Sequence, residues 1–470
     1  AQAPFFVGRV RTTDSPPPRR APLVGVSLAA VALMGLIAGP SVSPAAADAR
    51  AWTVTNPPPG CWCWAKLLSA VLPGQPPGCR SRSSVAREAA SSSGLTLLPG
   101  PKKDKAAKWE QDGRFVEGNL VGQNKWLGGC RGKDGAIYGM PGHAKHVLKI
   151  VPETGEVSLL GGPYEGDFKW LRGALGDDGA VYGIPCWADN VLKISSDGEV
   201  STFGGTFPGQ FKWHGGVKGH DGCIYGIPAN AERVLKIDPI KGEVTTIGPP
   251  LPGSQKWYGG LLGVDGAIYG MPMQANSVLK IVPSTGEVTT IGTLPEGGWK
   301  WHGGVAGPDG CIYGIPANAE RVLRIDPRKG EVKLIGPSLS SGQHRQDGKY
   351  KFLGGVVGSD GNVYGMPGDA DAVLRIVPST EEVTLIGGPF LGENKWQNGF
   401  LAKDDCIYGI PLRAEAVLKI DCRSGEVTTV RPPEGPLKGK DKWEGGVVGL
   451  DGALYCMPLR AKAVLKIGPF

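Results

Sequence analysis

The sequence predicts an all-β fold: a closed β-propeller of eight four-stranded blades, with seven blades as the alternative, after a largely disordered N-terminal extension. Three observations predict it. The 470 residues include 75 Gly and 41 Pro, a level that indicates disorder unless a period is present. Each repeat carries four short β-like runs, which is typical of one propeller blade. The repeat landmark, Tyr-Gly-x-Pro, recurs at spacings of 43 to 51 residues and begins at Tyr138, Tyr182, Tyr225, Tyr269, Tyr313, Tyr364, Tyr408 and, with Cys in place of Gly, Tyr455.

The repeat is clearest at residues 256–292, KWYGGLLGVDGAIYGMPMQANSVLKIVPSTGEVTTIG. Its four runs are Trp-x-Gly-Gly-x-x-Gly, x-Ile-Tyr-Gly, Val-Leu-Lys-Ile and Glu-Val-Thr-x-Ile-Gly. Asp-Gly joins the first two runs, which is the strongest short-range signal of a β-hairpin. Pro-x-x-Gly joins the last two, because Pro presets φ and Gly can take a positive φ. Each repeat is therefore expected to be a four-stranded antiparallel meander.

The ends of the repeat array indicate how the ring closes. The eighth copy stops at residues 464–467 and lacks its fourth strand, whereas residues 114–122 (RFVEGNLVG) have the pattern of that strand. We predict that Arg114–Val121 completes the last blade, which leaves no open sheet edge. The Trp-x-Gly-Gly run is then innermost. The Lys-Trp and Pro-x-x-Ala loops share one face, here called the top, and the Asp-Gly turns share the other, the bottom.

The N-terminal part divides into a leader, residues 1–49, and a flexible Pro/Ser/Gly-rich linker, residues 50–112; the propeller is predicted for residues 113–470. Arg19 and Arg20 precede an apolar run, residues 22–39, and small residues follow, which is the layout of an export signal. The leader is similar to a bipartite plastid leader for the thylakoid lumen. The alternatives are secretion and a retained single-pass membrane anchor.

The charge distribution argues against a nucleic-acid partner. Residues 1–112 hold 13 Lys and Arg against 6 Asp and Glu, whereas residues 113–470 hold 38 of each. A nucleic-acid binder should carry its positive charge on the folded domain. We therefore expect no nucleic acid to bind the repeat domain.

An aromatic residue and a preceding Lys recur at the start of every repeat. The aromatic residues either form one sugar-binding platform per blade or pack against the next blade, and Phe352 among the Trp residues favours packing. The lysines either attract anions at the channel mouth or cover the aromatic rings and pair with acids. The aromatic residues are Trp126, Trp170, Trp213, Trp257, Trp301, Phe352, Trp396 and Trp443, and the lysines are Lys125, Lys169, Lys212, Lys256, Lys300, Lys351, Lys395 and Lys442.

The residue after the aromatic varies while its neighbours repeat. It is Leu127, Leu171, His214, Tyr258, His302, Leu353, Gln397 and Glu444 in the eight copies. The variation is either drift at a solvent-facing position or recognition of a single ligand. We predict a candidate ligand-binding site at the top channel mouth. Its selectivity would come from His214, Tyr258, His302, Gln397 and Glu444. An anionic ligand would be attracted by Lys212, Lys256 and Lys300.

We predict no metal, cofactor or catalytic residue. We interpret the Asp of each Asp-Gly turn as a turn residue and not as a calcium ligand, because no calcium-binding loop sequence follows it. Cys223, Cys311 and Cys406 share a repeat position with Ala and are expected to be small buried residues. In the third strand, Lys149 is expected to pair with Glu156 of the fourth strand, as would its equivalents in other blades.

The blade core, Asp-Gly-x-Ile-Tyr followed by Val-Leu-Lys-Ile-x-Pro-x-x-Gly-Glu-Val-Thr, resembles repeats of the virginiamycin B lyase, NHL and SMP-30-like propellers. The lyase-like repeat has Trp-Phe-Thr-Glu where this chain has Tyr-Gly-Ile-Pro or Tyr-Gly-Met-Pro. The Glu that supports metal or acid–base chemistry is absent there, so no catalytic residue is carried over. The Tyr-Gly-Ile-Pro form is also similar to repeat proteins of unicellular algae.

These observations predict a non-enzymatic binding or scaffolding module in an exported compartment, with a protein or an anionic ligand on its top face. One alternative is a lyase or lactonase-like enzyme, which carboxylates and His converging at the top mouth would favour. The other is a multivalent lectin, which eight equivalent pockets beside the Trp residues would favour. A membrane is a partner only if the leader is retained as an anchor.

Overall fold

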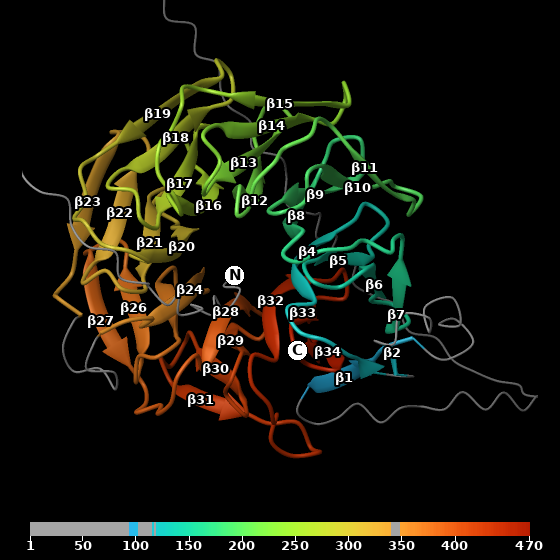
Figure 1. The fold of residues 1–470 in the computed structure, drawn as a ribbon. Coiled ribbons are helices and arrows are strands. Elements are labelled where there is room, and N and C mark those ends of the chain that lie inside the picture. Colours follow the sequence, from blue (N-terminus) through green and yellow to red (C-terminus); the bar gives the residue numbers. More distant parts are fainter. Residues whose placement is uncertain (1–93, 102–114, 117–118, 340–347) are drawn as a thin grey trace, which may run out of the picture. The chain divides into compact units, whose positions relative to one another are not determined.

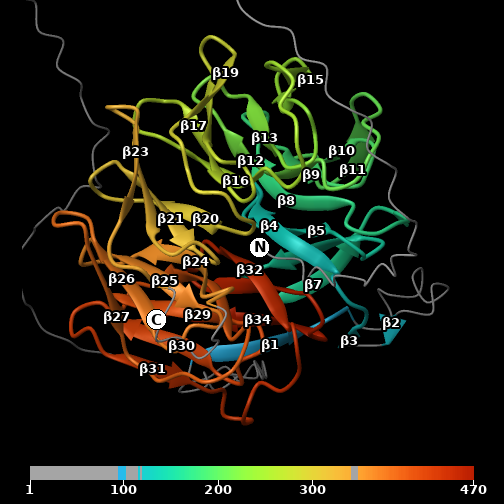
Figure 2. The ribbon, with the colours of Figure 1, turned by 60° about the vertical axis from the view of Figure 1, so that its left-hand side comes forward.

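A computed structural model describes residues 94–101, 115–116, 119–339 and 348–470 (Figure 1). Within these residues the chain forms eight four-stranded sheets, each antiparallel, and one two-stranded sheet. The sheets are arranged as the blades of a ring, which Figure 2 shows from a second direction. The prediction of eight blades is confirmed. No helix among the described residues has the length and apolar character to cross a bilayer.

The four positions in a blade are occupied by equivalent strands. The innermost strands are β4 (Trp126–Arg131), β8 (Trp170–Leu175), β12 (Trp213–Lys218), β16 (Trp257–Leu262), β20 (Trp301–Ala306), β24 (Phe352–Val357), β28 (Trp396–Leu401) and β32 (Trp443–Val448). The second strands are β5 (Ile137–Pro141), β9 (Val181–Pro185), β13 (Ile224–Pro228), β17 (Ile268–Pro272), β21 (Ile312–Pro316), β25 (Val363–Pro367), β29 (Cys406–Pro411) and β33 (Leu454–Pro458).

The outer half of each blade follows the same order. The third strands are β6 (Val147–Val151), β10 (Val191–Ile194), β14 (Val234–Asp238), β18 (Val278–Val282), β22 (Val322–Asp326), β26 (Val373–Val377), β30 (Val417–Asp421) and β34 (Ala463–Ile467). The outermost strands are β7 (Glu156–Leu160), β11 (Val200–Phe203), β15 (Glu243–Ile247), β19 (Glu287–Ile291), β23 (Glu331–Ile335), β27 (Glu382–Ile386), β31 (Val427–Val430) and β1 (Leu95–Pro99).

The last blade is completed by β1, so the N-terminal side of the array does close the ring, but through a different segment from the one predicted. Strand β1 pairs antiparallel with β34, from Leu95 opposite Ile467 to Pro99 opposite Ala463. The prediction that Arg114–Val121 fills this place is wrong, because β1 occupies it; the described residues of that range form the short hairpin of β2 (Phe115–Val116) and β3 (Asn119–Leu120). The closing strand therefore lies within the range predicted to be a linker. The five residues of β1, Leu-Thr-Leu-Leu-Pro, match the five of β34, and Leu95 is buried in the core.

The Tyr of each Tyr-Gly-x-Pro motif ties the second strand to the bottom turn. In all eight blades its hydroxyl donates to the Asp four residues earlier, at 2.6–2.8 Å. In the first blade Lys149 Nζ lies 3.5 Å from Asp134 and 5.5 Å from the centre of the Tyr138 ring. The prediction that Lys149 pairs with Glu156 is wrong, because the register places Lys149 opposite Ser158 and Glu156 opposite Val151.

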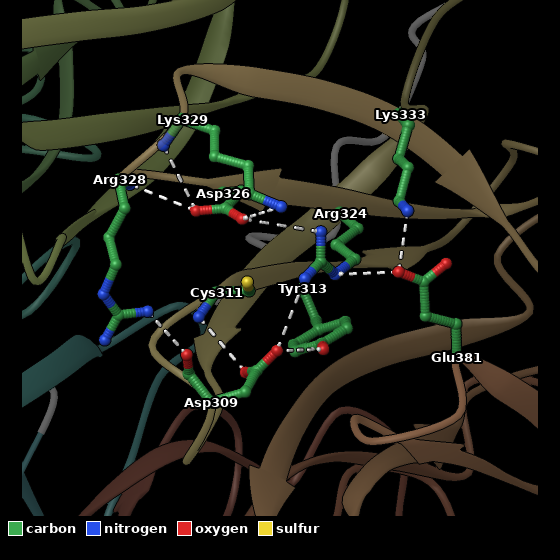
Figure 3. Close-up of polar contacts among 9 residues, drawn as sticks. All are labelled: Asp309, Cys311, Tyr313, Arg324, Asp326, Arg328, Lys329, Lys333 and Glu381. Atoms are coloured by element: carbon green, nitrogen blue, oxygen red, sulfur yellow. Dashed lines mark hydrogen bonds and ion pairs between the residues drawn. The ribbon is translucent and has the colours of Figure 1, made fainter.

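Ion pairs extend this arrangement between neighbouring blades. In Figure 3, Arg324 lies 3.7 Å from Asp309 of its own blade and 3.4 Å from Glu381 of the next. Lys333 Nζ reaches the same Glu381 carboxylate at 2.7 Å. The bottom turns therefore contribute to the stability of the ring, which leaves the inner strands and the top loops as places for a binding site.

Candidate functional site

A β-bulge in each inner strand positions the variable residue. In β12, Trp213 is opposite Pro228 and Gly216 is opposite Gly226, with a register shift between them. His214 and Gly215 lie inside this irregularity, and the other inner strands have the same shift at the same place. The extra residue leaves the regular ladder and bends the strand. The variable side chains therefore share one structural position around the inner edge of the ring.

All five selected polar residues at this position are buried. Their exposed fractions are 7% for His214, 1% for Tyr258, 2% for His302, and 0% for Gln397 and Glu444. The interpretation that this position faces bulk water is therefore wrong. Leu127, Leu171 and Leu353 occupy the equivalent places in the other blades, and the first two join an apolar cluster with Leu412 and Leu459.

Three of the polar residues form a continuous row on adjacent blades. The ring centres of His214 and Tyr258 are 3.7 Å apart, and those of Tyr258 and His302 are 4.5 Å apart. The planes are tilted by 33° and 40°. The structure thus brings together three residues that are separated by 44 positions each in the sequence.

The polar atoms of this set lack hydrogen-bond partners among the described residues. They are Nδ1 of His214, Oη of Tyr258, both ring nitrogens of His302, both amide atoms of Gln397 and both carboxyl oxygens of Glu444. Buried polar groups in native proteins are nearly always satisfied, and each unsatisfied one costs about 1–3 kcal/mol. Eight such atoms of the described residues therefore lie at a single repeat position.

Burial sets the protonation states of these residues. It lowers the pKa values of His214 and His302 well below the ordinary imidazole value, and the positive charge of Arg172 acts in the same direction. Burial raises the pKa of Tyr258 well above 10. It also raises the pKa of Glu444 to about 8, against the opposing effect of Arg172. Near pH 7 the two imidazoles are therefore neutral and the carboxyl group is largely protonated.

Arg172 also belongs to this region, although it is not among the residues predicted from the sequence. Six inner strands have Gly at the position that follows the variable residue, whereas β8 has Arg172 and β28 has Asn398. Both take positive φ, 62° and 56°, a conformation that costs an L-residue about 1–2 kcal/mol. The loss of the first Gly of Trp-x-Gly-Gly in these two copies was the available signal.

The eight lysines before the aromatic residues hold adjacent blades together. Lys256 Nζ donates to the carbonyl oxygens of Ala229 and Ala231 in the preceding blade, at 2.8 and 2.9 Å, and to that of Gly253 at 3.0 Å. Lys212 and Lys300 bond to backbone carbonyls in the same manner. All eight lysines are 1–4% exposed. Their ammonium groups are thus engaged by the protein's own backbone, and the geometry does not support the predicted role of Lys212, Lys256 and Lys300 in attracting a ligand.

The aromatic residues pack between blades, as the single Phe suggested. The seven Trp side chains are 1–4% exposed. Each indole Nε1 donates to the backbone carbonyl 20 residues later, at 2.7–3.0 Å, as in Trp257 to Ser277. The part of the chain that the structure describes therefore offers no exposed indole of this repeat position as a sugar-binding platform.

The residue before each Lys forms the top rim of the ring. In all eight blades it is a non-glycine residue with φ between 43° and 56° (Asn124, Phe168, Phe211, Gln255, Trp299, Tyr350, Asn394 and Asp441). Phe168, Phe211 and Trp187 are in mutual contact on one side of this rim, with ring centres 5.1–5.6 Å apart. A small apolar recess of about 10 Å³, room for roughly one water molecule, is lined by Phe211, Trp299, His214 and Tyr258, so the aromatic rim adjoins the row of polar residues.

Other titratable residues have structural partners. His143 forms an ion pair of 3.2 Å with Asp167, and the His146 ring nitrogen is 2.6 Å from the Gly161 carbonyl oxygen. Cys223, Cys311 and Cys406 are buried, as expected, and carry free thiols. No group of three or more His, Cys, Asp or Glu side chains within the described ranges has the geometry to hold a metal ion. His344 lies outside the described residues, as does the predicted leader.

Comparison with solved structures identifies the fold. The structure titled selenomethionine-substituted virginiamycin B lyase from Staphylococcus aureus matches 79% of this chain and 98% of its own, with a TM-score of 0.50 and 15% identity. The fold is that of virginiamycin B lyase-like β-propellers. A streptogramin B lyase structure matches 80% of this chain and 97% of its own, with a TM-score of 0.49 and 16% identity.

A more distant neighbour is the extracellular domain of a putative one-component system from B. thetaiotaomicron, with a TM-score of 0.44, 8% identity, and coverage of 74% of this chain and 53% of that one. No family model matches the sequence. No curated protein matches it either. At these identities the likeness establishes the fold and leaves the function to be argued from the site.

Proposed function

We propose that the propeller is a non-enzymatic binding module that receives a small polar ligand at the inner edge of its ring. The residues that contact the ligand are His214, Tyr258, His302, Gln397 and Glu444. The observation that carries the proposal is the concentration of their unpartnered polar atoms at one repeat position. The module acts in an exported compartment, which the basic and apolar leader supports.

The comparison among blades explains why these residues indicate recognition rather than structure. Three blades carry Leu at this position and keep the same bulge and the same register as the other five. The ring therefore does not need a polar residue here for its geometry. Buried polar groups without hydrogen-bond partners destabilise a fold. Hydrogen bonds to a ligand would explain why five such residues occur at one repeat position.

We place the ligand at the inner edge of the ring, where the row of His214, Tyr258 and His302 provides ring faces and hydrogen-bonding atoms. The apolar recess between Phe211 and Trp299, at about 10 Å³, has room for about one water molecule and is not the ligand's seat.

The test uses the full chain and a panel of small polar compounds, comprising polyols, amino acids, carboxylates and phosphate esters, in a thermal-shift assay confirmed by calorimetry. His302→Leu and Gln397→Leu are the informative variants, because Leu occupies the same position in three blades. We expect both to abolish the shift produced by any hit and to raise the melting temperature without ligand. A control, Thr289→Leu at an exposed position of the outermost strand β19, should retain binding. Hits that bind both inner variants as tightly as the wild type would refute the proposal.

A second candidate is an acid–base enzyme. One observation favours it: Glu444, whose pKa is about 8, occupies the same repeat position as the neutral imidazoles of His214 and His302. A protonated carboxyl group and a neutral imidazole are a suitable acid and base near neutral pH. Mass spectrometry of each hit after prolonged incubation separates the two candidates. Recovery of unchanged ligand supports the binding module, whereas conversion that Glu444→Gln abolishes supports the enzyme.

A further inference from the structure

Arg172 is a local exception to the repeat with no structural reason in its own blade. Six of the eight inner strands use Gly at this position with φ between 70° and 81°. Arg172 holds the same conformation, φ 62°, which a side chain disfavours. Strained residues of this kind persist where the surrounding structure holds them in place, and they cluster at functional sites.

Glycines of the neighbouring blades make room for the Arg172 side chain. A Cβ added at Gly128 of β4 would lie 3.0 Å from Arg172 Cγ, and one at Gly215 of β12 would lie 3.3 Å from Cδ. One at Gly259 of β16 would lie 3.7 Å from Nη1. The side chain therefore extends from β8 past β12 toward β16, along the positions that immediately follow His214 and Tyr258.

The guanidinium group has no hydrogen bond or ion pair to any described residue. A Cβ added at Gly303 of β20, beyond the end of the Arg172 side chain and next to His302, would meet no described atom within 4 Å. The neighbours of Arg172 in the ring do not neutralise it, because His214, His302 and Tyr258 are uncharged near pH 7 and Glu444 is largely protonated. A cation thus lies beside a row of neutral hydrogen-bonding groups.

We propose that Arg172 binds an anionic group, a carboxylate or a phosphate, of the ligand, whose uncharged polar part contacts His214, Tyr258 and His302. This inference rests on the proposed function and specifies the ligand as a small organic anion. A guanidinium fork pairs with either oxyanion through two parallel hydrogen bonds, which a Lys at the same place would not reproduce. The anionic preference predicted for the top face is thereby assigned to Arg172 and not to the lysines.

The experiment measures dissociation constants of the full chain by calorimetry for inorganic phosphate, succinate and uncharged glycerol at constant ionic strength. Arg172→Gly restores the residue found in six blades, so the variant is expected to fold. Asn398→Gly is the matched control: it makes the same change at the same repeat position in β28, relieves the same backbone conformation and removes no charge.

We expect Arg172→Gly to weaken binding of the preferred anion at least tenfold and Asn398→Gly to change it less than threefold. Arg172→Lys should weaken binding severalfold, because the charge remains but the fork is lost. A preference for phosphate over succinate, or the reverse, identifies the oxyanion. Both Gly variants should melt at higher temperature than the wild type without ligand.

Equal binding of the anion by the wild type and Arg172→Gly would overturn the inference, as would equal weakening in Asn398→Gly or binding of neither anion. These outcomes are separable from failure of the proposed function. If hits of the compound panel still depend on His302 and Gln397 while Arg172→Gly has no effect, the binding module stands and its ligand is uncharged.

Discussion

The buried carboxyl group of Glu444 makes a quantitative prediction about the pH dependence of stability. Burial raises its pKa from 4.5 to about 8 in the folded state, with Arg172 opposing the shift and Asp441 adding to it. Between these two values the folded state holds a proton that the unfolded state has released, so stability falls as pH rises. At 1.36 kcal/mol per pKa unit, the full effect of Glu444 is about 5 kcal/mol, reached above pH 8.

The perturbation is Glu444→Gln, which keeps the shape of the side chain and removes the ionisation. The difference in unfolding free energy between variant and wild type should be near its minimum at pH 5 and should grow by several kcal/mol in favour of the variant by pH 8.5. Chemical denaturation at pH 5, 6, 7, 8 and 8.5 measures this difference. Because His214 and His302 resist protonation in the folded state, they lower stability as pH falls below about 6.5 in both proteins, and the subtraction removes their effect.

The exposed Glu434 provides the control. Glu434→Gln should leave the pH profile of stability parallel to that of the wild type. Parallel profiles for Glu444→Gln as well would refute the reasoning, because they would mean that the Glu444 carboxylate is solvated or paired in the folded protein.

Three further predictions concern the ring itself. Deleting residues 94–99 should lower the melting temperature sharply, because it exposes the edge of β34, whereas deleting 115–118 should lower it much less; calorimetry compares the two. Lys256→Met should cost roughly 3 kcal/mol in urea denaturation, since it leaves three carbonyl oxygens without their donor, while exposed Lys241→Met should cost under about 0.5 kcal/mol. Trp257→Phe should cost about 1 kcal/mol for the lost indole hydrogen bond, and Trp257→Ala about 3–5 kcal/mol for the lost packing.

The architecture could be predicted because its signals are local and repeated. Asp-Gly and Pro-x-x-Gly specify turns through backbone conformations that few other residues adopt, and eight repetitions leave little freedom in strand order. The strand that closes the ring was harder to predict from the sequence, because two segments rich in apolar residues precede the first blade. Only pairing with β34 distinguishes them, and that pairing depends on a partner more than 360 residues away.

The candidate site could be predicted in part. Variation within a constant frame identified His214, Tyr258, His302, Gln397 and Glu444, which the structure places at one level of the ring. The lysines were misinterpreted because the sequence does not show which backbone carbonyls point toward an ammonium group. Arg172 was overlooked because a missing Gly reads as ordinary drift until the positive φ is known.

The departures from the repeat are informative because they differ in character. Where Phe352 replaces Trp, an apolar ring replaces an apolar ring and remains fully buried, so the frame is preserved. Where Arg172 replaces Gly, or Glu444 replaces Leu, the change introduces backbone strain or a buried ionisable group that no described residue compensates by a hydrogen bond. Arg172 extends toward β16 beside the row of His214, Tyr258 and His302, so these four residues meet in space although they come from four different blades. Independent drift would scatter such costs around the ring, whereas a ligand that bridges the blades would offset them together.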